Sequence, residues 1–286
     1  MSATLGTARA RNALPGADEA DPHARELAFS LEIAEQAGRL LMERYERVEQ
    51  IDYKSARDVV TEADHLSEAL ILDAIRARFP DDRLLAEESG RHEAANGTAD
   101  GLAGRVWIVD PLDGTVNYAN GIPFFCVSIG LIVDGRPAVG VVLDPTRNER
   151  YAATAGGPAT LEGRTVRVSD KERLTDFVIS LALGGRAVAT RSRAVRKAVR
   201  IPRSMGSAAL ALAYVANGRF DAFVQQGGLS AWDVAAAGLI AERAGARVTD
   251  FGGGPWFDEA RGPRALGLIA APPAHHATLL GLVREG

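Results

Sequence analysis

The sequence contains one cysteine, no long apolar run and no excess of positive charge. Cys126 cannot form an internal disulfide, and we interpret it as a core thiol because it lies within the apolar run FFCVSIGLI. No segment approaches the ~18 apolar residues of a membrane-spanning helix. The net charge of -4 argues against nonspecific nucleic-acid binding and against a membrane surface as the main partner. We therefore expect a globular cytoplasmic protein with neither kind of partner.

The chain of 286 residues, 47% of them apolar, is long enough for one large domain or two closely packed domains. We expect residues 1–22 to be a disordered leader, because their Ala, Gly and charged residues show no periodicity. An N-terminal α+β sub-domain is expected at residues 23–151 and a C-terminal α/β sub-domain at residues 152–286. No Pro/Ser-rich linker separates the two.

The first half reads as helices packed on an antiparallel sheet. Apolar residues at helical spacing predict helices over residues 26–47 and 63–79. Short apolar runs predict strands over 83–86 and 105–109, and residues 124–144 read as a hairpin that turns at Asp134 and Gly135.

After about Tyr151 shorter strands alternate with helices. The expected strands cover residues 165–168, 177–183, 220–224, 246–250 and 266–272. The expected helices cover residues 191–200, 207–217 and 234–245, and a further helix closes the chain. This pattern predicts an α/β arrangement.

Four acidic residues stand where apolar strands end or helices begin: Glu87, Asp110, Asp113 and Asp233. Such a carboxylate is costly to bury unless positive charge pairs with it. A set of carboxylates without His or Cys suits a hard divalent cation, Mg²⁺ before Ca²⁺ or Mn²⁺. Because Pro111 fixes the backbone between the two neighbouring aspartates, the Leu112 carbonyl could approach the same cation.

Each of these acids also has an ordinary structural explanation. Glu87 fits a solvated turn, Asp233 a helix N-cap, and Asp113 with Gly114 a tight turn. These explanations do not account for the buried apolar segment beside each acid. Thr115 is placed either to begin a helix whose free N–H groups favour a phosphate, or to act only as a cap hydroxyl.

The segment KSARDVVTEADHLSE carries polar residues ahead of and within the second helix. Its ordinary interpretation is that Thr61 caps the helix and that Asp64 lies in its first turn.

Five motifs follow one another in order between about Leu31 and Ala271: KSARDVVTEAD, LLAEES, WIVDPLDGTVNY, PRSMGSAAL and SAWDVAAAG. Together they resemble the inositol monophosphatase family, within the metal-dependent, lithium-sensitive phosphatases that include fructose-1,6-bisphosphatase. The resemblance implies an α/β (α+β) fold, a layered αβαβα sandwich, and a homodimer.

The resemblance also implies a site. The metal ligands would be Glu87, Asp110, the Leu112 carbonyl, Asp113 and Asp233, which would hold two or three Mg²⁺ ions, or Mn²⁺ in their place. Glu87 and Thr115 would hold the water that attacks phosphorus, Asp64 would accept a hydrogen bond from Thr115, and Lys54 would lie near the metals. The substrate would contact Gly114, Thr115, Gly206, Ser207, Ala208, Gln226 and Asp233.

Gln226 departs from the pattern of family members that prefer inositol, which carry an acidic residue seven positions before the equivalent of Asp233. We therefore expect hydrolysis of a small polyol or sugar phosphate by a metal-activated water, with inositol 1-phosphate as the first candidate. Fructose 1,6-bisphosphate, histidinol phosphate and a nucleotide 3'-phosphate follow in that order. The alternative of another class is a regulatory protein-interaction module on a phosphatase fold.

Overall fold

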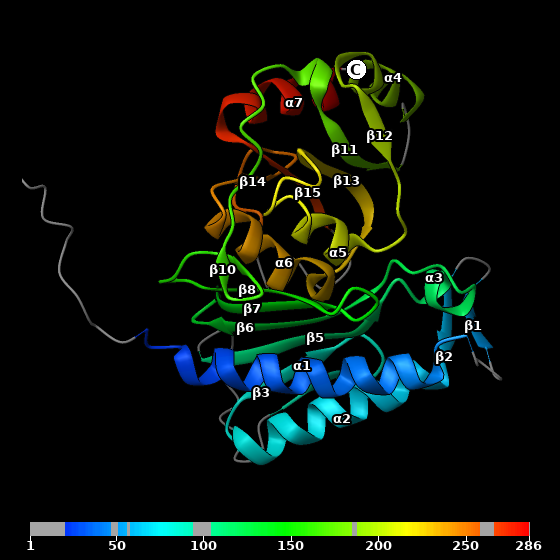
Figure 1. Cartoon of the computed structure of the whole chain (residues 1–286), viewed down its shortest axis with the longest axis vertical. Coiled ribbons are helices and arrows are strands. Elements are labelled where there is room, and N and C mark those ends of the chain that lie inside the picture. Colours follow the sequence, from blue (N-terminus) through cyan, green and yellow to red (C-terminus); the bar gives the residue numbers. More distant parts are fainter. Residues whose placement is uncertain are drawn as a thin grey trace, which may run out of the picture.

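A computed structural model describes residues 21–46, 51–55, 58–93, 104–184, 188–257 and 266–285. Layers of helices lie outside and between two sheets, which is the αβαβα sandwich implied by the resemblance (Figure 1). Of the expected leader at 1–22, residues 1–20 lie outside the described residues. Asp21 accepts a hydrogen bond from the Thr154 hydroxyl. Asp21, within the predicted leader, is therefore in contact with the folded chain.

Two long helices form one outer layer. They are α1 (Ala24–Arg44) and α2 (Glu62–Arg78), and a ribbon of β1 (Ile51–Ser55) and β2 (Asp58–Thr61) precedes α2. Their apolar faces supply much of one core, including Ile33, Ala37 and Leu41 of α1 and Ile71 and Ile75 of α2. Because this periodicity is plain in the sequence, the predicted helices agree with the observed ones at both ends to within a few residues.

The first sheet has the strand order β10-β9-β8-β7-β6-β5-β3-β4. Its strands are β3 (Arg83–Ala86), β4 (Gly90–His92), β5 (Arg105–Asp113), β6 (Cys126–Val133), β7 (Arg136–Asp144), β8 (Glu149–Thr154), β9 (Thr160–Leu161) and β10 (Arg164–Thr165). Neighbours are antiparallel except β3 and β5, which are parallel. Asp134 and Gly135 form the predicted hairpin turn, with φ of 50° and 73°.

The prediction of a strand at residues 165–168 was wrong. Only Thr165 belongs to β10, because the next residues change partners along the chain. The Val166 N–H donates to the Ala159 carbonyl, whereas the Val168 N–H donates to the Ala244 carbonyl. The segment is therefore extended without continuing one ladder.

The second sheet has the order β12-β11-β13-β15-β14, parallel from β12 to β13 and antiparallel beyond it. Its strands are β11 (Val178–Leu183), β12 (Ile201–Arg203), β13 (Ala222–Leu229), β14 (Arg247–Asp250) and β15 (Leu266–Ala271). The helices around it are α4 (Val188–Ala198) and α7 (Pro273–Glu285) outside and α5 (Ala208–Ala213) and α6 (Ala231–Arg243) inside (Figure 1).

Helix α5 is shorter than the predicted helix over 207–217. Residues 214–218 form turns instead, because the N–H groups of Val215, Ala216 and Gly218 donate to carbonyls three residues earlier rather than four. The short elements α3 (Thr115–Ala119) and η1 (Leu174–Asp176) complete the described chain.

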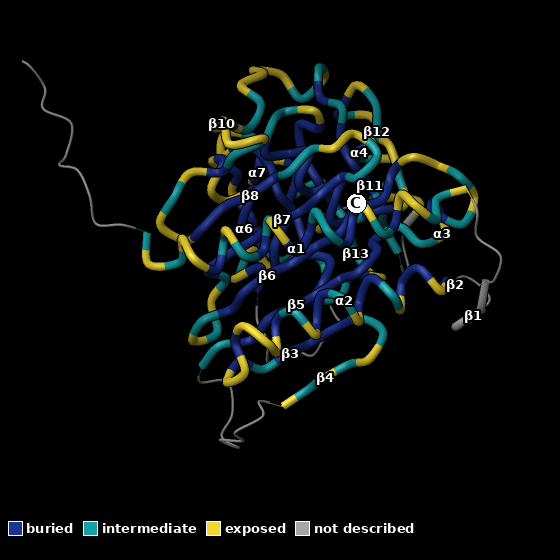
Figure 2. Tube along the Cα trace, turned by 60° about the horizontal axis from the view of Figure 1, so that its bottom comes forward, coloured by how far each residue is buried: buried dark blue, intermediate teal, exposed yellow. Residues whose placement is uncertain are grey.

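Helix α6 lies between the two sheets and is buried from Ala231 to Ala241 (Figures 1 and 2). Burial on all sides explains why its sequence is apolar almost throughout. The first sheet continues past residue 151 through β9 and β10, and α6 contacts strands of both sheets. The division into sub-domains near residue 151 stays a prediction.

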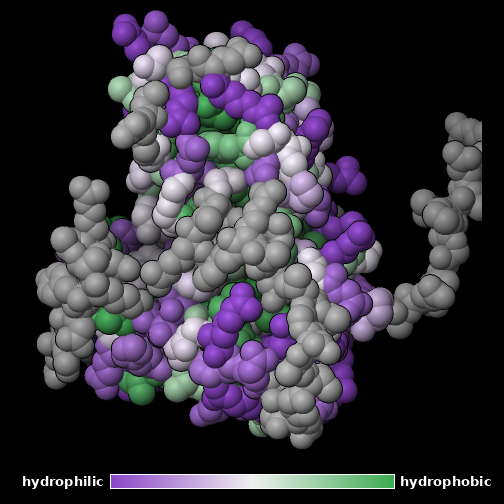
Figure 3. Space-filling model, turned by 180° about the vertical axis from the view of Figure 1, so that it is seen from behind, coloured by the Kyte–Doolittle hydropathy of each residue, from purple (hydrophilic) through white to green (hydrophobic). Residues whose placement is uncertain are grey.

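The face opposite to that of Figure 1 shows mostly hydrophilic side chains among the described residues, with apolar ones in hollows between them (Figure 3). None of the described helices combines the length and the hydropathy that crossing a membrane requires.

Candidate metal and phosphate site

Strand β5 runs four residues beyond Val109, where the sequence predicted its end, and carries two aspartates. Asp110 pairs with Ser128 of β6, and Asp113 pairs with Cys126, so three steps along β5 oppose two along β6. Residues three apart on a regular strand face opposite sides of the sheet. The extra residue is a β-bulge, which turns both aspartates to the same side.

Asp110, Asp113 and Asp233 converge, since each offers a carboxylate oxygen and these oxygens all lie within 4.8 Å of one another. All three residues are buried. Burial, together with repulsion from Glu87 and the other two aspartates, raises the pKa of Asp110 well above its ordinary value. Burial likewise raises the pKa of Asp233 well above that value, with repulsion from Asp113 as the next cause. The cluster has the all-oxygen chemistry that suits a hard divalent cation, which would offset this repulsion.

Two of these aspartates also cap helices. The Ser207 hydroxyl and the Ala209 N–H each donate to Asp113 Oδ2 at 2.6 Å. The Ser230 N–H donates to Asp233 Oδ2 at 2.5 Å, at the start of α6. Burial raises the pKa of Asp113, and the hydrogen bonds from the start of α5 oppose that rise. The sequence suggested Asp233 as a helix N-cap, but Ser230 is the N-cap of α6, and Asp233 lies in the first turn as the other half of a capping box.

Thr115 and Asp64 are hydrogen-bonded, as the resemblance implies. Thr115 Oγ1 lies 2.9 Å from Asp64 Oδ1 and 3.0 Å from the Leu112 carbonyl oxygen. The other Asp64 oxygen accepts from the Thr61 N–H at 2.8 Å and from the Thr61 hydroxyl at 2.6 Å. The expected cap of α2 is thus present, and it fixes the carboxylate that Thr115 contacts.

Gly114 occupies a position that strongly favours glycine. Its φ is 99°, and a Cβ there would lie 3.1 Å from the Phe124 carbonyl oxygen and from Ser207 Cβ. A side chain would therefore be strained and crowded at the turn that presents Thr115.

Glu87 follows β3, and its N–H donates to the Val109 carbonyl at 3.2 Å. Its half-buried side chain hydrogen-bonds to Asp110. The loop after it is held by Glu68 of α2, a buried residue that the sequence analysis missed. Glu68 accepts from the Glu88 N–H at 2.8 Å and from the Ser89 N–H at 2.9 Å. The available signal was a glutamate on the apolar face of α2.

Asn117 is a second residue that the sequence analysis missed. Its Nδ2 donates to the Phe124 carbonyl at 2.6 Å and to the Met205 carbonyl at 2.7 Å. A Cβ on Gly206, whose φ is 85°, would lie 2.9 Å from the Asn117 amide. These contacts bring Gly206 and Ser207, with Ala208 as the first residue of α5, beside the turn at Gly114.

Gln226 lies on β13. Its side-chain oxygen accepts a hydrogen bond from Arg191 of α4 at 2.5 Å. A carboxylate at this position would therefore meet a guanidinium. Lys54 lies on β1, but its side chain is outside the described residues, and its expected place near the metals stays a prediction.

Comparison with known proteins places the chain among phosphatases. The model of the inositol monophosphatase family matches residues 23–286. The chain is 38% identical to Nus factor SuhB of Pasteurella multocida, over 80% of this chain and 86% of that protein. It is 37% identical to fructose-1,6-bisphosphatase/inositol-1-monophosphatase of Thermotoga maritima, over 79% of this chain and 85% of that protein.

A solved structure has the same fold. The crystal structure of extragenic suppressor protein SuhB from Bartonella henselae superposes with a TM-score of 0.82 and 33% identity, over 92% of this chain and all of that one. Family, fold and the order of the motifs agree. The chain belongs to the inositol monophosphatase family and is a phosphoric monoester hydrolase.

Proposed function

We propose that the protein is a Mg²⁺-dependent phosphatase of small polyol or sugar phosphates, with inositol 1-phosphate as its first candidate substrate. The family is metal-dependent, and Mg²⁺ is its typical ion. The observation that carries the proposal is the convergence of three buried aspartates to within 4.8 Å, next to the hydrogen-bonded pair of Thr115 and Asp64. Buried carboxylates at this spacing are costly unless a cation joins them.

We assign the metal to Asp110, Asp113 and Asp233, with Glu87 and the Leu112 carbonyl as further ligands of two or three Mg²⁺ ions, which Mn²⁺ could replace. When bound, such ions lower the pKa of water and neutralise phosphate charge. Because capping hydrogen bonds orient Asp113 and Asp233, both carboxylates are held in place before any ion binds. This preorganisation lowers the cost of assembling the site.

Thr115 and Asp64 handle the proton in this proposal. The Thr115 hydroxyl has one proton, which it donates toward Asp64 Oδ1 or the Leu112 carbonyl. Either of its two lone pairs can accept a hydrogen bond from the attacking water. Thr61 holds Asp64 from the other side, so the pair can orient the water and draw off its proton.

The substrate side is assigned to residues on the approach to the cluster. Gly114 and Thr115 would present backbone N–H groups to the phosphate, and Lys54 would add positive charge. Gly206, Ser207 and Ala208 would face the alcohol, although the Ser207 hydroxyl already donates to Asp113. With Gln226 in place of an acid, we expect weak discrimination among polyol phosphates, since a neutral amide is a poorer acceptor for ring hydroxyls.

A phosphate-release screen tests the proposal. Inositol 1-phosphate, fructose 1,6-bisphosphate, histidinol phosphate and a nucleotide 3'-phosphate would be compared with and without Mg²⁺, and lithium should inhibit turnover. Asp233→Asn should lower the rate by orders of magnitude. Asp144→Asn removes another buried carboxylate, one outside the cluster, and should not change the Mg²⁺ requirement. Release that is independent of Mg²⁺ in the wild type would refute the metal assignment.

Two alternatives have support in the names of relatives. The name of the Thermotoga relative includes fructose-1,6-bisphosphatase, which keeps that substrate in the screen. Several relatives are named Nus factor SuhB, which keeps the regulatory protein-interaction alternative. A pull-down with Asp233→Asn separates an enzymatic role from a regulatory interaction role, because binding to a partner protein should survive the loss of hydrolysis. A homodimer, a cytoplasmic location and the absence of nucleic-acid and membrane partners stay predictions.

A further inference from the structure

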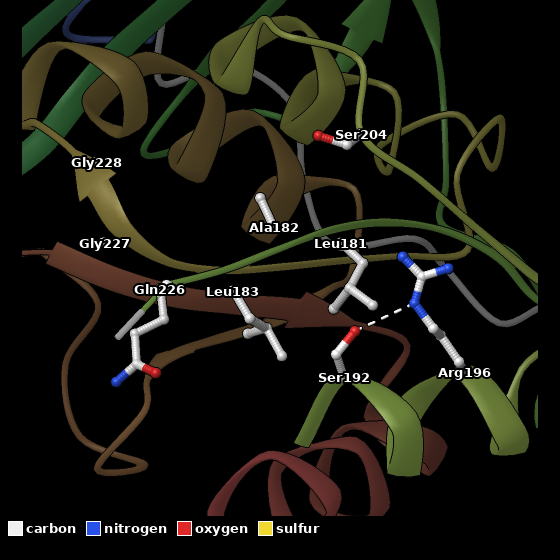
Figure 4. A pocket seen from close by; sticks show the side chains of 10 residues that line it. Leu181, Ala182, Leu183, Ser192, Arg196, Ser204, Gln226, Gly227 and Gly228 are labelled. Carbon is white, nitrogen blue, oxygen red and sulfur yellow. Dashed lines mark hydrogen bonds between the residues drawn. The ribbon is translucent and has the colours of Figure 1, made fainter. Parts of the chain in front are cut away.

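The segment that links β12 to α5 makes few hydrogen bonds of its own. Ser204 and Gly206 are exposed, and Ser204 lines a cavity of about 570 Å³, so one side of the segment faces open space (Figure 4). Among the described residues, the hydrogen bond that reaches residues 204–206 is the one that the Met205 carbonyl accepts from Asn117 at 2.7 Å. The hydrogen bonding of this segment therefore depends on Asn117.

Asn117 uses both hydrogens of its amide nitrogen. Its Nδ2 lies 2.6 Å from the Phe124 carbonyl oxygen as well as 2.7 Å from that of Met205, and the residue is buried. Carbonyl oxygens only accept hydrogen bonds, so the position requires a side chain with two donors on one atom. A serine or threonine hydroxyl has one donor and an ionised carboxylate has none. The two contacts therefore explain why an asparagine stands here.

The two segments that Asn117 joins meet at the turn of Gly114. A Cβ on Gly114 would lie 3.1 Å from the Phe124 carbonyl oxygen and 3.1 Å from Ser207 Cβ. The loop before β6 and the start of α5 therefore enclose this turn from two sides. Because one amide group bonds to both segments, it sets how closely they approach the turn.

The start of α5 in turn supplies the donors that orient Asp113. Ser207 comes two residues after Met205, and its hydroxyl donates to Asp113 Oδ2 at 2.6 Å. The Ala209 N–H donates to the same oxygen at 2.6 Å. A shift of the Met205 segment would move both donors together, and the Asp113 carboxylate would turn with them.

We propose that Asn117 is a positioning residue for the phosphatase reaction. By holding the Met205 carbonyl, its amide fixes the start of α5, and Ser207 and Ala209 then keep Asp113 in the orientation that a metal ion needs. Asn117 acts through these residues and is not itself a ligand. The inference rests on the proposed function, because it takes Asp113 as one of the metal ligands.

Asn120 offers a matched control beside the same short helix. Its Nδ2 also donates to a backbone carbonyl, that of Val116 at 2.7 Å, but the side chain is exposed and this bond stays within the turn. Asn117→Ala should raise the Kd for Mg²⁺, measured by calorimetry without substrate, by roughly tenfold, the effect of about one lost hydrogen bond. Asn120→Ala should leave this Kd unchanged. A lower melting temperature of Asn117→Ala with the wild-type Kd would overturn the inference.

Turnover should show the same division. In Asn117→Ala the Mg²⁺ concentration for half-maximal activity should rise roughly tenfold, as the Kd does. The kcat at saturating Mg²⁺ should fall by less, because Thr115 keeps its contact with Asp64. A loss of kcat with an unchanged Mg²⁺ requirement would overturn the inference.

A double-mutant cycle tests whether Asn117 acts through the start of α5. Ser207→Ala removes one donor to Asp113 and should itself raise the Kd for Mg²⁺. In that background Asn117→Ala should raise the Kd by clearly less than in the wild type, because part of what it positions is already gone. Fully additive effects would overturn the positioning role.

Hydrogen exchange of the metal-free protein separates this inference from the proposed function. The N–H groups of Ala209 and Leu210 donate to Asp113 and Ser207, so they should exchange faster in Asn117→Ala and at the wild-type rate in Asn120→Ala. If the wild type released phosphate without Mg²⁺ but this difference was found together with a higher KM, the metal assignment would fail and the positioning role would stand. Equal exchange in all three proteins would overturn the role and leave the proposed function intact.

Discussion

At the scale of single residues, the Thr115 hydroxyl can be separated from metal binding by experiment. It contacts Asp64 and the Leu112 carbonyl but is not one of the clustered carboxylates. Thr115→Ala should lower kcat by about 100-fold to 10,000-fold, the range for losing a proton-transfer group. The Mg²⁺ concentration for half-maximal activity should stay unchanged. Thr115→Ser keeps the hydroxyl and should keep most of kcat. If Thr115→Ala instead raised the Mg²⁺ requirement and left kcat normal, Thr115 would be only a structural cap.

A second residue-scale prediction concerns stability. Asp233→Asn removes one of three repelling buried charges, yet the amide oxygen can still accept from the Ser230 N–H. The free energy of unfolding without metal should therefore stay the same or rise. Wild-type protein should gain about 2.7 kcal/mol at a Mg²⁺ concentration of 100 Kd, and the variant should lose most of this gain. Denaturant titration with and without Mg²⁺ measures both effects, and an equal gain in the two proteins would contradict the assignment.

Part of this residue pattern can be predicted from the sequence. Asp110, Asp113 and Asp233 stand beside apolar segments, and a strand or helix there must bury them. The bulge after Asp110 cannot be predicted, because it depends on pairing with β6. Arg191 beside Gln226 and Asn117 beside Met205 are long-range contacts that no local pattern announces.

At the scale of elements, α2 carries two carboxylates one turn apart that bind two different segments of the site. Asp64 reaches Thr115, while Glu68 holds the loop after Glu87. Glu68→Gln leaves one acceptor oxygen for two backbone N–H groups, so the loop should loosen. We expect kcat/KM to fall roughly tenfold to a hundredfold and the Mg²⁺ requirement to rise. Glu62→Gln is the control, because Glu62 is exposed on the same helix. If Glu68→Gln lowered the melting temperature but left Mg²⁺ activation unchanged, the role of Glu68 would be only structural.

Helix α7 gives a pH-dependent prediction. His276 is buried, its Nε2 lies 3.0 Å from the Thr249 hydroxyl, and its Nδ1 has no hydrogen-bond partner among the described residues. Burial, and then the charge of Arg247, lower its pKa. In the unfolded chain the imidazole binds a proton near pH 6.5, so stability should fall as pH drops below about 6.5, by at most about 1.4 kcal/mol per pH unit. His276→Gln should flatten this part of the curve in denaturant titrations, and an unchanged slope would contradict the assignment.

The elements that the sequence predicts well are those in which the repeating apolar pattern extends over many residues. Two amphipathic helices and the hairpin at Asp134 were predicted because their patterns extend over many residues. Strands β9, β10 and β12 have two or three residues each, too few to show alternation. Their existence depends on the neighbours that pair with them, which a local pattern does not contain.

At the scale of the whole molecule, α6 joins the two halves and begins at the metal cluster. Asp233 lies in its first turn, and its later residues lie against the first sheet. Gly130 and Gly140 are paired across β6 and β7 directly beneath it. A Cβ on Gly130 would lie 3.1 Å from Ala235 Cβ. The position of the cluster and the packing of the two sheets are therefore set by the same helix.

This arrangement predicts that one methyl group far from the chemistry should affect both stability and metal use. A Cβ on Gly140 would lie 2.6 Å from the Ala236 carbonyl oxygen, which is backbone and cannot rotate away. Gly140→Ala should therefore push α6 off the sheet and lower the free energy of unfolding by about 1–3 kcal/mol. Because Asp233 moves with the helix, the Mg²⁺ concentration for half-maximal activity should rise as well.

The matched control is Gly281→Ala in α7, where a Cβ would meet no atom of the described residues within 4 Å. That variant should raise the free energy of unfolding by about 0.5–1 kcal/mol, because alanine stabilises a helix interior relative to glycine. Its Mg²⁺ requirement should match the wild type. Denaturant titration and Mg²⁺ activation curves of the two variants measure these effects side by side. If Gly140→Ala lost stability but kept the wild-type Mg²⁺ requirement, the first turn of α6 would be held by the capping of Asp233 independently of the sheet beneath it.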